Sequence, residues 1–307
     1  MFEIIFLGTS ASAPSIRRGL SSQIVKHDEY RFLVDCGEGT QRQILQAGVG
    51  FKRLNRILLT HSHLDHILGL GGLLSTLTRW EALDEIEIYG GRNTLERVHN
   101  LLYGVVWPNR KPDAKIHLHE IKPGVIFEAK NFSITAFHVS HRGPGCLGYR
   151  FEEKSHRPFL AEKADALGVP FGPERRDLVQ GKGVTLADGR RIAPDEVLGS
   201  LIKGTSLAIT GDTGKTSNLL DAVKGVNTLV IESTYIHEDA EMARNFGHLT
   251  ARQAAELAKQ ANVQRLILTH LSRRYRERDI LNEARAIFPE SYVARDFDTY
   301  SVKREEK

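Results

Sequence analysis

The sequence predicts a mixed α/β fold whose sheets are partly antiparallel. First, short apolar or alternating runs succeed one another in the first half of the chain, each bounded by glycine, proline, aspartate or asparagine. Second, only two stretches between these runs carry helical spacing, and consecutive strands without an intervening helix favour antiparallel pairing. Third, a chain of 307 residues with 41% hydrophobic side chains is long enough to bury a sizeable core.

The predicted elements alternate along the chain in this irregular order. Strands are expected over Glu3–Leu7, Gln23–Val25, Arg31–Val34, Arg56–Thr60, Glu85–Tyr89, Lys115–Ile121, Asn131–His138, Ser206–Gly211, Thr228–Ile231 and Arg265–Thr269. Helices are expected over Gly39–Ala47, Thr94–Tyr103, Ala251–Gln260 and near Ile280–Ile287. Thr250 with Gln253 three residues later is the pattern of a capping box at the third of these helices.

One segment, from about Arg150 to Lys203, breaks the periodicity. It mixes charges of both signs with the turn cluster Gly168–Pro173 and with Asp188-Gly189, which is a hairpin signal. We therefore expect residues 150–203 to form an arm inserted into one domain that spans residues 1–307.

Composition narrows the class of protein. Charged residues make up 26% of the chain, which is typical of a soluble globular protein and excludes disorder as its main state. The longest apolar stretch, Ile67–Leu74, falls short of the ~20 residues of a membrane-spanning helix. The start of the chain lacks the basic region of a signal peptide. A cytoplasmic protein that does not enter a membrane is expected, and the net charge of +4 is compatible with a polyanionic partner.

The two cysteines, Cys36 and Cys146, stand outside any CxxC pair, so we expect both to be small buried side chains. The glycine cluster Gly69–Gly72 is weak evidence for a nucleotide loop. It is expected instead to permit close packing where a helix begins.

The chemistry is concentrated in one loop. Directly after the apolar run Ile57–Leu59 come His61, His63, Asp65 and His66, which are four metal-competent groups within six residues. His61 and His63 alternate along an extended segment and can reach one ion, whereas Asp65 and His66 can turn toward a second. The spacing therefore indicates two metal ions.

Two ions need further ligands, and the candidates each follow a short apolar strand: His141, Asp212 and His270. Asp212 could bridge the ions with its two oxygens. A histidine at a strand end is more often a turn residue than a ligand, and His138 is a rival to His141 three residues earlier on the same strand. Two metal ions about 3.5–4 Å apart would activate water and stabilise charge on a phosphoryl or acyl oxygen.

The loop His61–His66 is the HxHxDH signature and resembles the metallo-β-lactamase superfamily, which implies an αββα sandwich with a dinuclear zinc site. The wider set of motifs resembles the ribonuclease Z family, the endonucleases that mature tRNA 3′ ends. Those motifs are Phe6–Thr9, Asp35–Gln41, Ile209–Thr213, Glu232–Thr234, His248–Thr250 and Thr269–Tyr275.

This resemblance implies a role for each site residue. It assigns His61, His63 and His141 to one zinc ion, Asp65, His66 and His270 to the other, and Asp212 to both. Asp65 would help to deprotonate the attacking water. Glu232 would orient His248, which would protonate the leaving ribose 3′-oxygen as a general acid. Manganese or another divalent ion is an alternative to zinc, because imidazole and carboxylate also accept it.

The resemblance also implies how precursor tRNA is bound. The arm would grip tRNA through Gly168, Pro170, Gly172 and Pro173, and Arg18, Arg273 and Tyr275 would contact substrate near the site. The enzyme would be a homodimer in which one subunit holds tRNA for the other. One departure concerns the family's PxKxRN motif, where Ile16 and Gly19 replace lysine and asparagine, so discrimination against a CCA end is in doubt.

Two alternatives stay open from the sequence. An enzyme of the same fold could hydrolyse small phosphodiesters or thioesters. A non-catalytic RNA-binding protein could carry purely structural metals, although structural zinc sites are usually closed cages of four cysteine or histidine ligands.

Overall fold

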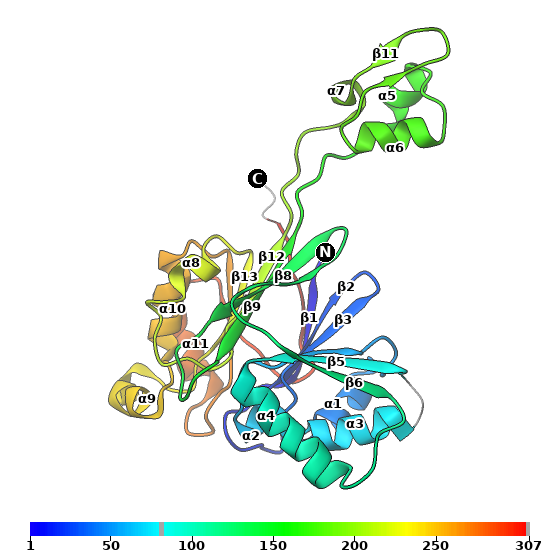
Figure 1. Ribbon diagram of the computed structural model, residues 1–307. Coiled ribbons are helices and arrows are strands. Elements are labelled where there is room, and N and C mark those ends of the chain that lie inside the picture. The colour runs from blue at the N-terminus through cyan, green and yellow to red at the C-terminus, as the bar shows by residue number, and fades with distance from the viewer. Residues whose placement is uncertain (80–82, 305–307) are drawn as a thin grey trace. The chain divides into compact units, whose positions relative to one another are not determined.

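The computed structural model describes residues 1–79 and 83–304, and the chain divides into two compact units (Figure 1). Unit 1 comprises Met1–Glu152 and Thr205–Lys307, and unit 2 comprises Glu153–Gly204. The predicted arm thus overlaps unit 2, but residues 150–152 belong to a strand of unit 1. None of the helices in the described ranges is both long and apolar enough to cross a membrane.

Within the described residues, unit 1 is built on two seven-stranded sheets. The first has the order β16-β1-β2-β3-β4-β5-β6, with β1 Glu3–Gly8, β2 Ser22–His27, β3 Tyr30–Val34, β4 Arg56–Leu58, β5 Glu85–Gly90, β6 Lys115–Glu120 and β16 Thr299–Ser301. The second has the order β15-β14-β13-β12-β9-β8-β7, with β7 Gly124–Glu128, β8 Phe132–His138, β9 Leu147–Glu153, β12 Ser206–Ile209, β13 Thr228–Glu232, β14 Arg265–Thr269 and β15 Ser291–Val293.

Strand alternation divides the apolar side chains of unit 1 into layers. On β1, Ile4 and Phe6 join the cluster between the sheets, whereas Ile5 and Leu7 join the cluster under the first group of helices. The other outer cluster lies between the second sheet and its helices and includes Leu229 and Leu266. The result is the predicted αββα sandwich.

Helices cover the outer face of each sheet (Figure 1). The first group comprises α1 Thr40–Gln46, α2 Leu64–Ile67, α3 Leu70–Arg79, α4 Arg92–Leu101 and the π-helix Leu102–Val106. The second comprises α8 Leu220–Val223, the 3₁₀ turn His237–Asp239, α9 Ala240–Phe246, α10 Ala251–Gln260 and α11 Glu277–Arg285. Unit 2 contains α5 Ala161–Ala166, α6 Pro173–Val179, β10 Val184–Thr185, β11 Arg191–Ile192 and α7 Pro194–Val197.

Local predictions near the site are confirmed. The Thr250 hydroxyl accepts a 3.3 Å hydrogen bond from the Gln253 amide, and the Gln253 side chain accepts one of 2.9 Å from the Thr250 amide. Gly69 permits close packing at the start of α3, because a Cβ there would lie 2.0 Å from the Gly37 carbonyl oxygen. Cys36 and Cys146 are free and buried.

Parallel strands position the site. β3 pairs in parallel with β4, and β12, β13 and β14 pair in parallel with one another. The carboxyl ends of parallel strands meet at one edge of a sheet, and loops at such an edge commonly carry functional side chains. The five loops that follow these strands begin at or near Asp35, Thr60, Gly211, Ser233 and His270.

Candidate metal centre

Seven histidine and aspartate side chains from distant parts of unit 1 meet at this edge. The loop after β4 supplies His61 and His63, and its continuation into α2 supplies Asp65 and His66. Loops after β8, β12 and β14 bring His141, Asp212 and His270. His61, His66, Asp212 and His270 are buried.

The first group of donor atoms comes from His61, His63, His141 and Asp212, which lie within 4.8 Å of one another. His63 Nδ1 lies 3.0 Å from His61 Nε2 and 3.2 Å from His141 Nε2. The Oδ2 atom of Asp212 lies 3.6 Å from His61 Nε2 and 3.8 Å from His141 Nε2. The four side chains therefore surround one point.

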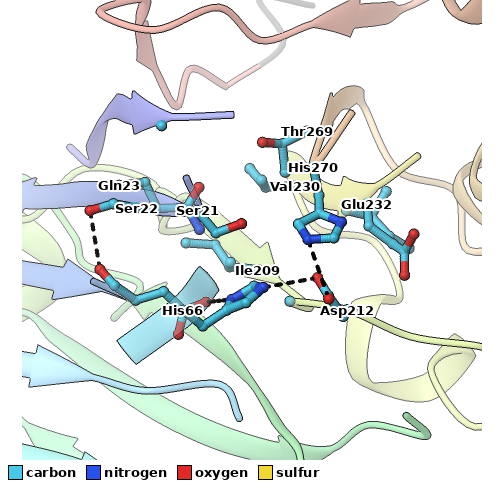
Figure 2. Close-up of a pocket in the computed structure, with 14 residues that line it drawn as sticks. Ser21, Ser22, Gln23, His66, Ile209, Asp212, Val230, Glu232, Thr269 and His270 are labelled. Atoms are coloured by element: carbon cyan, nitrogen blue, oxygen red, sulfur yellow. Dashed lines mark hydrogen bonds and ion pairs between the residues drawn. The ribbon is translucent and has the colours of Figure 1, made fainter. Parts of the chain in front are cut away.

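The second group comes from Asp65, His66 and His270. His270 Nε2 lies 3.3 Å and His66 Nε2 lies 3.8 Å from Asp65 Oδ2. Asp212 also faces this group, because its Oδ1 lies 3.4 Å from His66 Nε2 and its Oδ2 lies 3.4 Å from His270 Nε2 (Figure 2). The carboxylate of Asp212 thus lies between the two groups.

The donor set fits divalent metal ions. His66 Nε2 and Asp212 Oδ1 are buried and have no hydrogen-bond partner among the described residues. Both residues border a cavity of about 20 Å³, which is large enough for one water-sized occupant. Unsatisfied buried polar atoms are costly unless a ligand or ion completes them. The nitrogen separations of 3.0 and 3.2 Å in the first group are close to the ~3.3 Å between nitrogens on a tetrahedral zinc ion.

The protonation states of the first group of side chains suit coordination as well. Burial lowers the pKa of His61, His63 and His141, so these rings are neutral near pH 7, and neutral imidazole is the form that binds metal. Burial would raise the pKa of Asp212, but His270 and His66 outweigh it and hold that pKa well below the usual value. Asp212 is therefore ionised, and its negative charge can attract a cation on either side.

Further side chains hold the ligand rings in place, and the sequence analysis assigned no such role to Asp35, Thr60 or Thr234. His66 Nδ1 lies 2.8 Å from Asp35 Oδ2, and the Thr60 amide donates a 2.8 Å hydrogen bond to Asp35 Oδ1. His270 Nδ1 lies 2.9 Å from the Thr234 hydroxyl, which donates to Glu232. Such contacts fix the orientation of a ligand ring and raise its basicity. Asp35 does stand in one of the quoted motifs, but nothing local to it signals this contact.

The backbone is strained at two of these residues. Asp35 and His270 have φ angles of 59° and 55°, in the left-handed region that side chains other than glycine rarely adopt. Each such residue costs on the order of 1–3 kcal/mol and persists where the surrounding structure enforces it. Both lie where a strand ends and a site side chain turns toward the cluster.

His248 and Glu232 form a pair beside the cluster. His248 Nδ1 lies 2.8 Å from Glu232 Oε1 and 4.0 Å from Asp212 Oδ2. Burial would lower the pKa of His248, but the charge and hydrogen bond of Glu232 raise that pKa to about 9. The second ring nitrogen, Nε2, has no hydrogen-bond partner among the described residues. His248 is thus oriented with one nitrogen able to give a proton.

His138, the alternative to His141, is exposed at the end of β8 and contributes to none of the clusters in the described part of the chain. Arg18, expected at the substrate, is held by intramolecular partners: Nη1 donates to the Thr9 hydroxyl and to the Ala294 carbonyl, and Nη2 lies 3.0 Å from Glu277. Its guanidinium therefore supports the loop that contains it.

None of the other predicted substrate residues belongs to a ligand cluster in the described part of the chain. Arg273 is exposed in the loop after His270, and the Tyr275 hydroxyl donates to Asp239 while its ring packs beside Tyr235. In unit 2, Gly168, Pro170, Gly172 and Pro173 are all exposed around the start of α6.

Comparisons with sequence profiles and with curated relatives identify the family of this chain. Residues 2–155 match the family described as anti-Pycsar protein Apyc1, and residues 172–271 match the β-lactamase superfamily domain. A curated ribonuclease Z from Bradyrhizobium sp. (strain ORS 278) is 46% identical over 302 residues, which is 98% of this chain and 100% of that protein. The chain belongs to the ribonuclease Z family.

Solved structures show the same fold for ribonuclease Z and its wider superfamily. Human tRNase Z, short form, aligns with a TM-score of 0.70 at 24% identity and covers 98% of this chain and 100% of that one. The metallo-β-lactamase fold protein YhfI from Bacillus subtilis aligns with a TM-score of 0.70 at 18% identity, over 97% and 98% of the two chains. Family membership identifies the chain as a hydrolytic ribonuclease, and the His/Asp clusters are a candidate site for divalent metal ions.

Proposed function

We propose that this chain is a cytoplasmic zinc-dependent endoribonuclease that removes the 3′ trailer from precursor tRNA. Cleavage near the discriminator base would leave a 3′-hydroxyl on the tRNA and a 5′-phosphate on the trailer. The observation that carries the proposal is the position of the Glu232–His248 pair directly beside two ligand groups that share Asp212. The name of the relatives supports the choice of RNA as substrate.

Each of the two ligand groups would bind one metal ion. His61, His63 and His141 would hold one, Asp65, His66 and His270 the other, and Asp212 both. When bound, two divalent ions polarise phosphoryl oxygens and make water nucleophilic at neutral pH. Zinc suits a set of five imidazoles and two carboxylates, and manganese is an alternative for the same reason.

The remaining steps belong to side chains of this chain. A bond forms between the water oxygen and phosphorus, the bond from phosphorus to the ribose 3′-oxygen breaks, and one proton leaves the water while another reaches the 3′-oxygen. Asp65 would accept the proton from water. His270 and His66 hold its pKa below the usual range, against burial, so that the side chain is an unprotonated carboxylate at neutral pH. His248 would give the other proton from Nε2, with Nδ1 anchored on Glu232.

Substrate capture would use unit 2. Its exposed turn Gly168–Pro173 would contact tRNA. In unit 1, Arg273 and Tyr275 would also contact tRNA, and Arg18 would act through the loop that it supports. We further propose a homodimer, which sedimentation of the purified protein would test by its mass.

The direct test is cleavage of a 3′-extended precursor tRNA that lacks CCA, with and without a chelator, alongside a small aryl phosphodiester. We expect the chelator to abolish cleavage of the precursor and added zinc to restore it. Turnover of the small diester without cleavage of the precursor would leave a small-molecule phosphodiesterase. Binding of the precursor without metal-dependent cleavage would leave an RNA-binding protein. A precursor carrying CCA would show whether Ile16 and Gly19 relax the block against that end.

A further inference from the structure

A second cavity, of about 390 Å³, opens in unit 1 next to His141. Three segments line it: the end of β8 with the loop that follows, the turn after Asp212, and the C-terminal end of α9. The lining residues are His138, Val139, Ser140, His141, Arg142, Gly143, Gly214, Lys215, Arg244, Asn245 and Gly247.

The cavity is cationic and none of its charges is neutralised. Arg142, Lys215 and Arg244 are exposed, and none of them forms an ion pair with a carboxylate in the part of the chain that the structure describes. Among the described lining residues there is no aspartate or glutamate. Arg18, by contrast, is paired with Glu277. Three unpaired cations around one cavity favour an anionic ligand.

Close backbone packing holds the three segments together. Gly214 lies so near Gly247 that a Cβ on Gly214 would be 3.0 Å from the Gly247 Cα. The Gly214 amide donates a 2.7 Å hydrogen bond to the Ser140 carbonyl oxygen, and Gly247 has a φ of +71° that favours glycine. The cations thus extend from a fixed frame rather than from independent loops.

One imidazole ring separates this cavity from the ligand groups. His141 Nδ1 lies 2.7 Å from the carbonyl oxygen of Gly247, which lines the cavity, whereas its Nε2 faces His63 and Asp212. Gly247 directly precedes His248, the proposed proton donor. A strand that presents its scissile phosphate to the ligand groups, with its leaving 3′-oxygen toward His248, would bring its next phosphate on that side toward the cavity.

We propose that Arg142, Lys215 and Arg244 bind a backbone phosphate of the RNA strand on the 5′ side of the scissile bond. The direction of the strand rests on the proposed function, because it follows from proton transfer by His248 to the leaving 3′-oxygen. Phe246, 46% exposed with its ring centre 5.6 Å from the Arg142 guanidinium, adds an aromatic face beside the cations. Aromatic and cationic side chains together are typical of sites for single-stranded nucleic acid.

The test removes two of the cations and compares two substrates. The double variant Lys215→Ala/Arg244→Ala should raise KM for precursor tRNA by about tenfold or more, because each charge-assisted contact to phosphate is lost. The dependence of log KM on log salt should become less steep by at most about 0.7, because the lost contacts are to one phosphate of a single strand. Turnover of the small aryl diester should not change, since that substrate has no second phosphate. The matched control Lys224→Ala/Lys259→Ala removes two exposed lysines elsewhere and should behave as wild type.

A second measurement locates the phosphate. Precursors in which one phosphate is replaced by a neutral methylphosphonate should lose affinity for the wild type at one position on the 5′ side. The Lys215→Ala/Arg244→Ala variant, which keeps only Arg142 of the three cations, should show a much smaller further loss at that position, while neutralisation on the trailer side should affect both proteins equally. The conservative variant Lys215→Arg should retain the wild-type KM.

The outcomes separate the two proposals. If the wild type cleaves precursor tRNA but the double variant matches its control, the phosphate pocket is wrong and the proposed function stands. Equal loss of both substrates in the double variant would mean a structural role and would overturn the pocket. If the wild type cleaves no precursor tRNA, the proposed function fails and the assigned strand direction fails with it.

Discussion

The side chains of the ligand clusters in unit 1 and those of unit 2 differ in burial and in how firmly their neighbours hold them. In unit 1, site side chains such as His66 and His270 are buried, and each ring has a second partner that fixes its orientation. In unit 2, the core is one cluster that contains Leu178 and Ile192, and the turn before α6 leaves Phe171 87% exposed. A unit of roughly fifty residues buries little apolar surface and is marginal in isolation. Substitutions in the clusters should therefore change the chemical step, whereas substitutions in unit 2 should change substrate binding.

Among the substitutions that compare the two regions, Asp212→Ala should cause the largest loss of cleavage activity. It removes a carboxylate that faces both ligand groups, so we expect precursor cleavage to fall by about 10⁴-fold, the loss of several kcal/mol of transition-state stabilisation. Bound metal should fall at the same time, measured by elemental analysis of the purified variant. Asp221→Ala, which removes an exposed carboxylate on α8, is the matched control and should leave both values unchanged. Full activity of the Asp212 variant would sink the assignment.

The next largest effect is expected for His248→Ala. Loss of a positioned general acid should slow cleavage of precursor tRNA by about 10²–10³-fold in single-turnover experiments. An aryl diester with a good leaving group needs no proton, so its hydrolysis should fall far less. Metal content should stay at the wild-type value. Equal losses on both substrates would argue that His248 supports the metal site instead of protonating the leaving oxygen.

A smaller effect, on metal affinity, is expected for a side chain that contacts a ligand ring without being a ligand itself. Asp35→Asn keeps the volume of the side chain but removes the charge that faces His66 Nδ1. We expect metal affinity to weaken by about 10–100-fold, measured by competition with a chelator of known affinity. Unchanged affinity would show that packing alone orients His66.

The smallest effect is expected in unit 2. Gly172 has a φ of +139°, so Gly172→Ala strains the turn before α6 and should raise KM for precursor tRNA several-fold without changing kcat. Hydrolysis of the small diester should stay at the wild-type rate, because it does not need unit 2. A fall in kcat on both substrates would contradict the separation of the two regions.

The sequence predicted the parts of the site whose pattern is local. His61, His63, Asp65 and His66 stand within six residues. His141, Asp212 and His270 each follow an apolar strand, which made them candidate ligands, and the resemblance to the family implied the full set. The loop from Asp35 to Gln41 was noticed only as a motif. Its contact with His66 depends on the parallel pairing of β3 with β4, which no local periodicity reveals.

The same limit applies to the fold. The strand β16 pairs with β1 across almost the whole chain, Ile4 opposite Tyr300, and it was not predicted because three residues give no clear alternation. The strands β7, β9 and β15 were missed as well, and the helix expected at Thr94–Tyr103 instead spans Arg92–Leu101 and continues as a π-helix. The helices of unit 2 were not predicted, because charged turns interrupt their short apolar pattern. Conversely, the capping box at Thr250 was predictable because both partners lie within one turn.

The measurement that tests the central claim most directly is a titration of metal-free protein with zinc, in which cleavage of precursor tRNA is followed at each step. If Asp212 joins two ligand groups as the geometry indicates, activity should rise until two ions are bound per chain and then stay constant. Full activity with a single bound ion, or with none, would contradict the account of a shared two-ion centre.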